Sequence, residues 1–202
     1  MNPQTIIFIG RSGCGKGTQA KLVEKYIKEN DTMGRALDYV EIGAGLREFL
    51  KGESYTSKLT KEIYLRSDRQ SDYIAIWMWS HQLIEKMTGE EHIIIDGTPR
   101  LLTQALVLSD AFNFYERPLN VIYVNISREV AVARLMHRGR SDDSLIQINK
   151  RLDWFDTDVV PAIEYFQKRA LENPAICNFI EVSGEQEIEK VHADILAQLK
   201  VF

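Results

Sequence analysis

A glycine-rich stretch near the start of the chain constrains the fold more than any other feature of the sequence. The letters GRSGCGKGT run from Gly10 to Thr18, directly after the apolar segment TIIFI. They fit the pattern G-x-x-x-x-G-K of a phosphate-binding loop (P-loop), which needs a strand before it and a helix after it. Backbone N–H groups of such a loop surround phosphate oxygens, and Lys16 reaches the β and γ phosphates of a nucleotide. A Gly-rich turn without a ligand is the alternative.

Short apolar runs recur along the chain between longer segments with helical patterns. They cover residues 5–10, 39–43, 92–96, 119–126 and 177–183. Strands that alternate with helices are typical of βαβ units, in which helices cover both faces of a parallel sheet. The expected fold class is therefore α/β, with a five-stranded parallel sheet and helices on both faces.

Two of the expected helices have apolar residues at i, i+3, i+4 spacing. The two faces comprise Ile74, Trp77, Met78, His81 and Ile84, and Ile188, Val191, His192, Ile195 and Leu199. We therefore interpret His81 and His192 as core residues rather than ligands. Ser183 and Gln186 have the spacing of a capping box, which predicts that the last helix begins there.

Composition favours a single domain. The chain has 202 residues, of which 45% are apolar, enough for one core. Its two cysteines, Cys14 and Cys177, form no CxxC pair, so neither a disulfide framework nor a zinc site is expected. The net charge of -4 argues against nucleic acid as a partner, and no leader or run of eighteen apolar residues indicates a membrane. We expect a cytoplasmic monomer.

An acidic residue ends the third expected strand. Asp96 follows the apolar run HIII, and an aspartate at the end of a strand beside a P-loop is typical of a Walker B site, which organises Mg²⁺. The loop has Gly17 where the ordinary motif has Ser or Thr, and its hydroxyl comes one position later, on Thr18. We therefore predict that Thr18 and Asp96 serve the magnesium ion that accompanies the nucleotide.

The loop form GKGTQ and three further motifs in the same order resemble the adenylate kinase family of nucleoside monophosphate kinases. The resemblance extends from Ile6 to about Val191. It implies a P-loop kinase fold, and it implies ATP binding by the following residues: Gly13, Cys14, Gly15, Lys16, Gly17, Thr18, Arg134, Arg138 and Gln186. We interpret Cys14 as a small residue of the loop, not as a nucleophile.

Two further segments are similar to the family's acceptor-binding motifs. DGTPRLLTQ matches D-G-[FY]-P-R-x-x-x-Q, with Thr98 in place of the usual aromatic residue. EIGAGLR matches the family's S-T-G-D-hydrophobic-L-R segment, with Ile42 and Ala44 in place of Thr and Asp. The resemblance implies that arginines bind the acceptor phosphate and that Gln104 hydrogen-bonds the adenine edge of AMP. The implied AMP-binding residues are Gly43, Arg47, Gln70, Gly97, Arg100, Gln104, Arg140 and Arg151.

Four arginines crowd into residues 134–151 of an otherwise acidic chain: Arg134, Arg138, Arg140 and Arg151. Guanidinium groups suit phosphate clamps because they donate hydrogen bonds in a fixed fork, although a solvated basic face is the alternative. The resemblance implies that the catalytic residues are Lys16, Arg100, Arg138, Arg140 and Arg151. Only Gly139 separates Arg138 from Arg140, where family members carry a lid, so the lid is expected to be almost deleted.

These observations predict one adenylate-kinase-like domain over residues 1–202. Its core is expected to comprise residues 1–42, 74–137 and 143–202, with a helical acceptor-binding insertion at 43–73 and a minimal lid at 138–142. The implied activity is reversible phosphoryl transfer from Mg·ATP to AMP, which gives two ADP. The expected partners are therefore the small-molecule nucleotides ATP, AMP and ADP.

Two other functions stay open at this point. A UMP/CMP kinase has Asn at the base-reading position, so Gln104 argues against it, whereas Ile42 in place of Thr keeps it possible. A non-catalytic ATP-binding module on the same fold would need only the P-loop. It would have no use for Arg47 and Arg100, the arginines of a second phosphate site.

Overall fold

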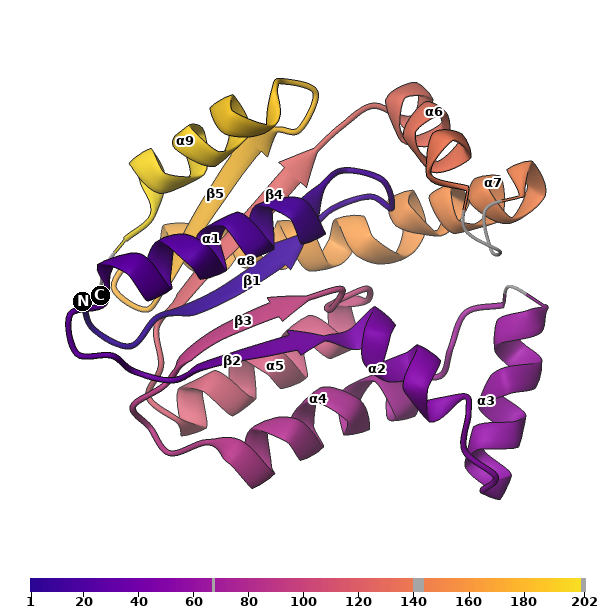
Figure 1. The fold of residues 1–202 in the computed structure, drawn as a ribbon, viewed down its shortest axis with the longest axis horizontal. Coiled ribbons are helices and arrows are strands. Elements are labelled where there is room, and N and C mark those ends of the chain that lie inside the picture. Colours follow the sequence, from indigo (N-terminus) through magenta and orange to yellow (C-terminus); the bar gives the residue numbers. More distant parts are fainter. Residues whose placement is uncertain (67, 140–143, 201–202) are drawn as a thin grey trace.

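Five parallel strands form the centre of the protein, in the order β2-β3-β1-β4-β5 (Figure 1). The structure is a computed structural model that describes residues 1–66, 68–139 and 144–200. The strands are β1 (Thr5–Ile9), β2 (Leu37–Glu41), β3 (His92–Asp96), β4 (Leu119–Asn125) and β5 (Cys177–Ser183). Neighbouring strands all pair in parallel, which confirms the predicted α/β fold class and five-stranded parallel sheet.

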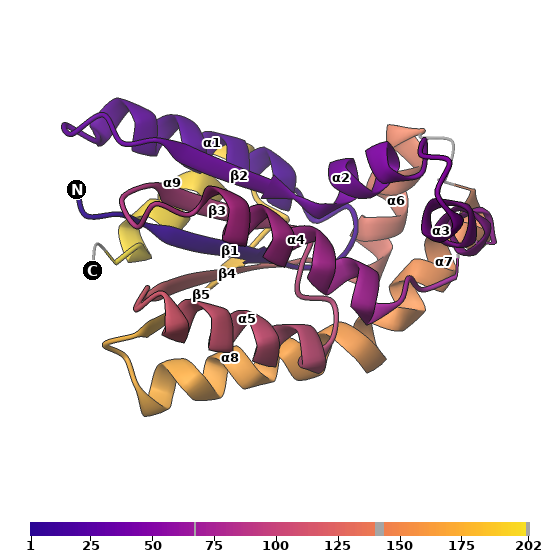
Figure 2. The same cartoon turned by 90° about the horizontal axis from the view of Figure 1, so that it is seen from below.

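Helices cover both faces of the sheet, as expected (Figure 2). One core lies under α4 (Asp72–Lys86), α5 (Leu102–Phe114) and α8 (Val160–Glu172). The other lies under α1 (Lys16–Asn30), α6 (Arg128–Arg138), α7 (Leu145–Trp154) and α9 (Ile188–Gln198). Strand β1 serves both cores, because Ile7 and Ile9 face the first and Ile6 and Phe8 the second. Burial on both faces explains why this strand is a continuous apolar run.

Two short helices lie outside these layers, beside the carboxyl ends of the strands (Figure 1). They are α2 (Ile42–Phe49) and α3 (Tyr55–Leu65), and they connect β2 to α4. Ser54 caps α3, because its side chain accepts a hydrogen bond from the Ser57 N–H at 3.0 Å. The predicted strand over 39–43 is wrong at its end, since Ile42 and Gly43 already belong to α2.

The predicted apolar face of α4 is right for Ile74, which is buried, and for Met78, which packs against the core, but wrong for the other three residues. Trp79 and Leu83 are buried, whereas Ile84 is exposed and His81 stacks its ring on Trp77 at the surface. The segment IAIWMW is apolar at every position, so the 3.6-residue period fits more than one face. His81 is therefore not a core residue.

The start of α9 also differs from the prediction. The helix begins at Ile188, and no side-chain cap bonds its first turn. Gln186 donates instead to the Ser183 carbonyl at 3.2 Å and to the Asp194 carboxylate at 3.1 Å. The capping box of Ser183 and Gln186 is thus absent, although Val191 and Ile195 are buried as predicted.

A π-helical turn, η1 (Phe155–Val159), joins α7 to α8. Pro161 follows it in the first turn of α8, where the missing N–H of proline is tolerated. Such turns often mark functional positions because they rotate the side chains that follow. Across the described ranges, no helix is both long and apolar enough to cross a membrane.

His92, a buried histidine at the start of β3, predicts how the stability of the fold depends on pH. His92 accepts a hydrogen bond from the Gln4 N–H at 3.0 Å, and its Nε2 lies 3.5 Å from the Asp31 carboxylate. Burial lowers the pKa of His92 despite Asp31, and the nearby Arg35 and Arg117 act in the same direction. The His92 imidazole therefore binds a proton more readily in the unfolded chain than in the folded protein. The free energy of unfolding consequently decreases as pH falls below about 6.5.

We expect the free energy of unfolding to fall between pH 7 and pH 5, with a slope of at most about 1.4 kcal/mol per pH unit for one proton, and the melting temperature to fall with it. His92→Gln should flatten that slope in thermal denaturation measured by circular dichroism. His81→Gln, at the surface, is the matched control. An equal slope in His92→Gln and the unsubstituted protein would contradict this assignment.

Candidate functional site

The carboxyl ends of β1, β2 and β3 open into a cleft of about 660 Å³, the position at which parallel sheets generally bind ligands. The cleft brings together predicted residues from six separate segments: Gly13, Gly15, Lys16, Gly17, Thr18, Gly43, Arg47, Gln70, Asp96, Gly97, Arg100, Gln104, Arg134, Arg138 and Arg151. An adjoining pocket of about 270 Å³ is lined by Cys14 and Gln186. Arg140 and most of the expected lid at 138–142 lie outside the described residues.

The P-loop is tightly packed against the rest of the core. A Cβ atom on Gly10 would lie only 2.6 Å from the Val124 carbonyl oxygen, so no side chain fits there. Cys14 is buried, in keeping with its interpretation as a small residue of the loop. The Lys16 ammonium donates to the carbonyls of Gly10 and Arg11 at 3.3 Å each, which holds it at the rim of the loop.

Arg11 anchors this loop to the π-helical turn. Its Nη2 donates to the Asp156 carboxylate at 2.8 Å, and its guanidinium carbon lies 4.1 Å from the centre of the Phe155 ring. The turn directly follows α7, which carries Arg151 into the same cleft. Arg11 therefore links the loop that holds Lys16 to the helix that holds Arg151.

Loss of this link should misalign the loop without unfolding the protein. We expect Arg11→Ala to lower kcat of the reaction at this cleft by about 10² with a small change in KM, because misplacement by about 1 Å has that effect on aligned reactants. Arg128→Ala is the matched control, since Arg128 also pairs with an acidic residue near Arg151, Asp153 of α7 at 2.7 Å, but belongs to α6 and not to the P-loop. Equal kcat values for the two variants in steady-state assays would refute the role of Arg11.

Asp96 lies at the end of β3, beside the P-loop. Burial raises the pKa of its carboxyl group, and the nearby charge of Lys16 opposes that shift. Its Oδ1 is buried and makes no hydrogen bond within the described ranges. A Cβ on Gly17 would lie 3.2 Å from Oδ2, so a glycine in place of the usual Ser or Thr makes room for this carboxylate.

The residues around Asp96 fit a magnesium ion held together with a nucleotide. Asp96 offers a buried oxygen without a partner, and the Thr18 side chain belongs to the same cleft. Within the described part of the chain, no three His, Cys, Asp or Glu side chains gather into a metal site. A metal ion would therefore depend on phosphate oxygens for most of its ligands.

Two arginines lie on the side of the cleft formed by α2 and the start of α5. Arg47 pairs with Glu41 at 3.3 Å. A Cβ atom on Gly43 would lie 3.3 Å from Nη1 of Arg47. Arg100 donates through Nε to the Gly97 carbonyl at 2.9 Å. The structure thus brings the two predicted acceptor-phosphate arginines into the same cleft as Lys16.

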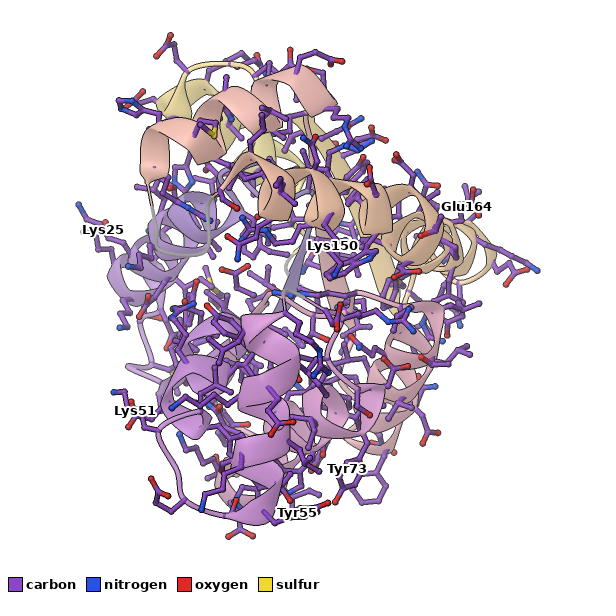
Figure 3. The ribbon with its side chains drawn as sticks, turned by 90° about the vertical axis from the view of Figure 1, so that its right-hand side faces the viewer. Lys25, Lys51, Tyr55, Tyr73, Lys150 and Glu164 are labelled. Atoms are coloured by element: carbon purple, nitrogen blue, oxygen red, sulfur yellow. The ribbon has the colours of Figure 1, made fainter. Side chains whose placement is uncertain are left out.

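Two ion pairs cross the cleft between the α3–α4 connection and the α7–η1 segment. Lys150 contacts Asp68 at 2.5 Å, and Arg69 contacts Asp158 at 3.0 Å. Figure 3 shows Lys150 between α7 and the α3 side of the molecule. Sequence reasoning did not predict these ion pairs or the contact of Arg11. The segment DRQSD, residues 68–72, resembles the turn that closes the family's acceptor subdomain, and this resemblance pointed to Asp68 and Arg69 but not to their partners.

The fold and this cleft define a P-loop phosphotransferase, in which the glycine-rich loop with Lys16 and a second group of cations, Arg47 and Arg100, share one cleft. The family model described as "Adenylate kinase" matches residues 8–171. The chain therefore belongs to the adenylate kinase family.

Curated relatives agree with this assignment over nearly the whole chain. The adenylate kinase of Prochlorococcus marinus (strain MIT 9301) is 29% identical over 194 residues, covering 94% of this chain and 95% of the relative. Adenylate kinase 1 of Nostoc sp. (strain PCC 7120) is 27% identical, covering 96% and 97%. The adenylate kinase of Parabacteroides distasonis is 31% identical, covering 80% and 83%. The chain is therefore a nucleotide-binding kinase of the nucleoside monophosphate class.

Proposed function

We propose that this protein transfers the γ-phosphoryl group of Mg·ATP reversibly to AMP, giving two ADP, and acts as a cytoplasmic monomer. The observation that carries the proposal is the shared cleft of Lys16, on the donor loop, and Arg47 and Arg100, on the acceptor side. A module that only binds ATP has no need of the second group. Residues 43–73 would bind the acceptor, and the core would bind the donor.

The reaction needs no covalent nucleophile on the protein. An oxygen of the AMP phosphate attacks the γ-phosphorus in line, the bond to the ADP oxygen breaks, and ADP leaves. The protein contributes by alignment and by charge. Lys16, Arg138 and Arg151 neutralise the charge on the transferring group, and Arg47 and Arg100 hold the acceptor phosphate.

Lys16 has to leave the carbonyls of Gly10 and Arg11 to reach phosphate oxygens. The exchange is favourable because a phosphate carries full charge, whereas a carbonyl oxygen carries only a partial one. Magnesium, when bound, neutralises charge on the donor phosphates, and Asp96 and Thr18 are the residues that would hold it. Closure of the arginine-bearing helices and of the insertion would exclude water from the reacting group.

The test is an acceptor panel with purified protein and Mg·ATP. AMP, CMP, UMP and GMP are supplied in parallel, with a control without acceptor that reports hydrolysis. We expect rapid formation of ADP with AMP. A preference for CMP or UMP would replace this proposal with a pyrimidine kinase, and binding of ATP without transfer to any acceptor would leave only a binding module.

A further inference from the structure

Gln104, the residue expected to read the acceptor base, is already held by three groups of the protein. It lies in the first turn of α5, is almost fully buried and lines the cleft. Its Oε1 accepts from the Arg100 N–H at 2.9 Å and from the Thr98 hydroxyl at 3.1 Å. Its Nε2 donates to the Asp72 carboxylate at 3.0 Å.

The orientation of this amide follows from the chemistry of its partners. The backbone N–H of Arg100 can only donate, so it faces the amide oxygen. The carboxylate of Asp72 can only accept, so it faces the amide nitrogen. Asp72 is itself held, because Thr103 donates to its other oxygen at 2.6 Å.

Thr98 completes the saturation of the oxygen. An amide oxygen has two lone pairs, and Arg100 and Thr98 occupy both. The nitrogen has two hydrogens, of which Asp72 takes one. Gln104 therefore has an N–H to offer a bound base, and no free lone pair.

The neighbouring groups of the cleft wall are only partly engaged. The Gly97 carbonyl accepts from Arg100 Nε at 2.9 Å. Gln70 donates to the Thr60 carbonyl at 3.1 Å, whereas its own amide oxygen is buried and has no hydrogen-bond partner among the described residues. Ile42 offers only an aliphatic side chain to the cleft. What distinguishes Gln104 itself is that its amide oxygen is already occupied and is not available to the amino group of adenine.

We infer that Thr98 is a specificity-determining residue, which makes Gln104 read the acceptor base through an N–H donor alone. The inference rests on the proposed function. Adenine offers an acceptor at N1 to this donor, and so does a purine that lacks the amino group at carbon 6. The acceptor class is thus purine nucleoside monophosphates with a hydrogen-bond acceptor at this edge, with or without the 6-amino group.

The physical basis is the cost of an unpaired buried group. A site that reads an amino group rejects an analogue without it by about 10⁴, because the site's own acceptor is then left unpaired. Here Thr98 and Arg100 satisfy the Gln104 oxygen whether or not the amino group is present. Removal of the amino group from the substrate consequently leaves the Gln104 oxygen paired.

The decisive measurement compares kcat/KM for AMP with that for purine riboside 5′-monophosphate, which lacks only the 6-amino group. We expect a ratio below about fivefold, whereas a ratio of about 100-fold or more would overturn the inference. Absence of transfer to AMP itself would instead contradict the proposed function, so the two failures are distinguishable.

Three variants test the role of Thr98. Thr98→Val removes one donor from the Gln104 oxygen, which can then accept a hydrogen bond from the 6-amino group of AMP. The ratio of kcat/KM for AMP to kcat/KM for purine riboside 5′-monophosphate should therefore rise at least about fivefold. Thr98→Ser keeps the hydroxyl and should preserve the original ratio. Thr103→Val removes a hydroxyl from the same network without touching Gln104, and should also preserve it. A ratio unchanged in Thr98→Val would refute the assignment to Thr98.

Discussion

Lys16→Met is expected to lower kcat for phosphoryl transfer by about 10³ and to weaken ATP binding, while the protein stays folded. Removal of one preorganised donor to developing charge costs about 10² to 10³ in rate, and Lys16 also carries a full charge. Methionine has a similar length and helix propensity, so α1 should still begin at this position. Among the described residues the ammonium bonds only two carbonyls, at 3.3 Å each, so little stability depends on it.

The measurement is a coupled assay of ADP formation, combined with ATP titration and thermal denaturation. Lys25→Met is the matched control, because Lys25 lies on the same helix, is exposed and pairs only with Glu29 at 3.7 Å. Near-normal turnover in purified, folded Lys16→Met would contradict the assignment of the P-loop as the donor site. A loss of similar size in Lys25→Met would point to the helix rather than to the phosphate site.

Much of the fold was predictable because burial on both faces imposes a simple pattern. Strands β1 and β3 are buried at every residue, and their central residues appear in the sequence as the unbroken apolar runs IIFI and III. The face of α4 was not predictable in the same way. Its sequence is apolar around most of the helix, and the choice between faces depends on which side meets the sheet.

The candidate site was predictable where the chemistry requires a particular residue at a particular spacing. Lys16, Asp96 and Arg100 follow from motifs within short segments, and the structure places them around one cleft. The residues that hold the site in place were not predictable. Arg11 meets Asp156 across 145 positions, a contact that no local pattern encodes.

The same limit explains why Gln104 was only partly understood from its motif. Its spacing from Arg100 predicted a base-reading residue at the cleft, and its side chain does line the cleft. Its hydrogen bonds, however, depend on Asp72, which is 32 positions away at the start of another helix. Residue type and spacing predict which side chain is present, whereas the tertiary contacts decide which of its atoms stay free for a ligand.

Arg138→Ala is expected to have the second large effect, a loss of about 10³ to 10⁵ in kcat, by analogy with arginines that stabilise a transferring phosphoryl group. Arg138 ends α6 and lines the cleft that also holds Lys16. Its charge matters most when negative charge spreads over the transferring oxygens, so kcat should fall far more than KM for ATP rises. Arg138→Lys should recover only part of the rate, because an ammonium lacks the planar fork of donors.

Arg128→Ala separates this role from a general effect on the helix. Arg128 begins the same helix and pairs with Asp153, but it does not line the cleft. We expect this control to keep kcat within about twofold of the unsubstituted protein, since exposed ion pairs contribute little to stability. If Arg138→Ala instead raised KM for ATP with kcat unchanged, Arg138 would bind the substrate and the transition state equally. Stabilisation of the transferring group would then belong to other cations of the cleft, with Arg151 of α7 the next to test.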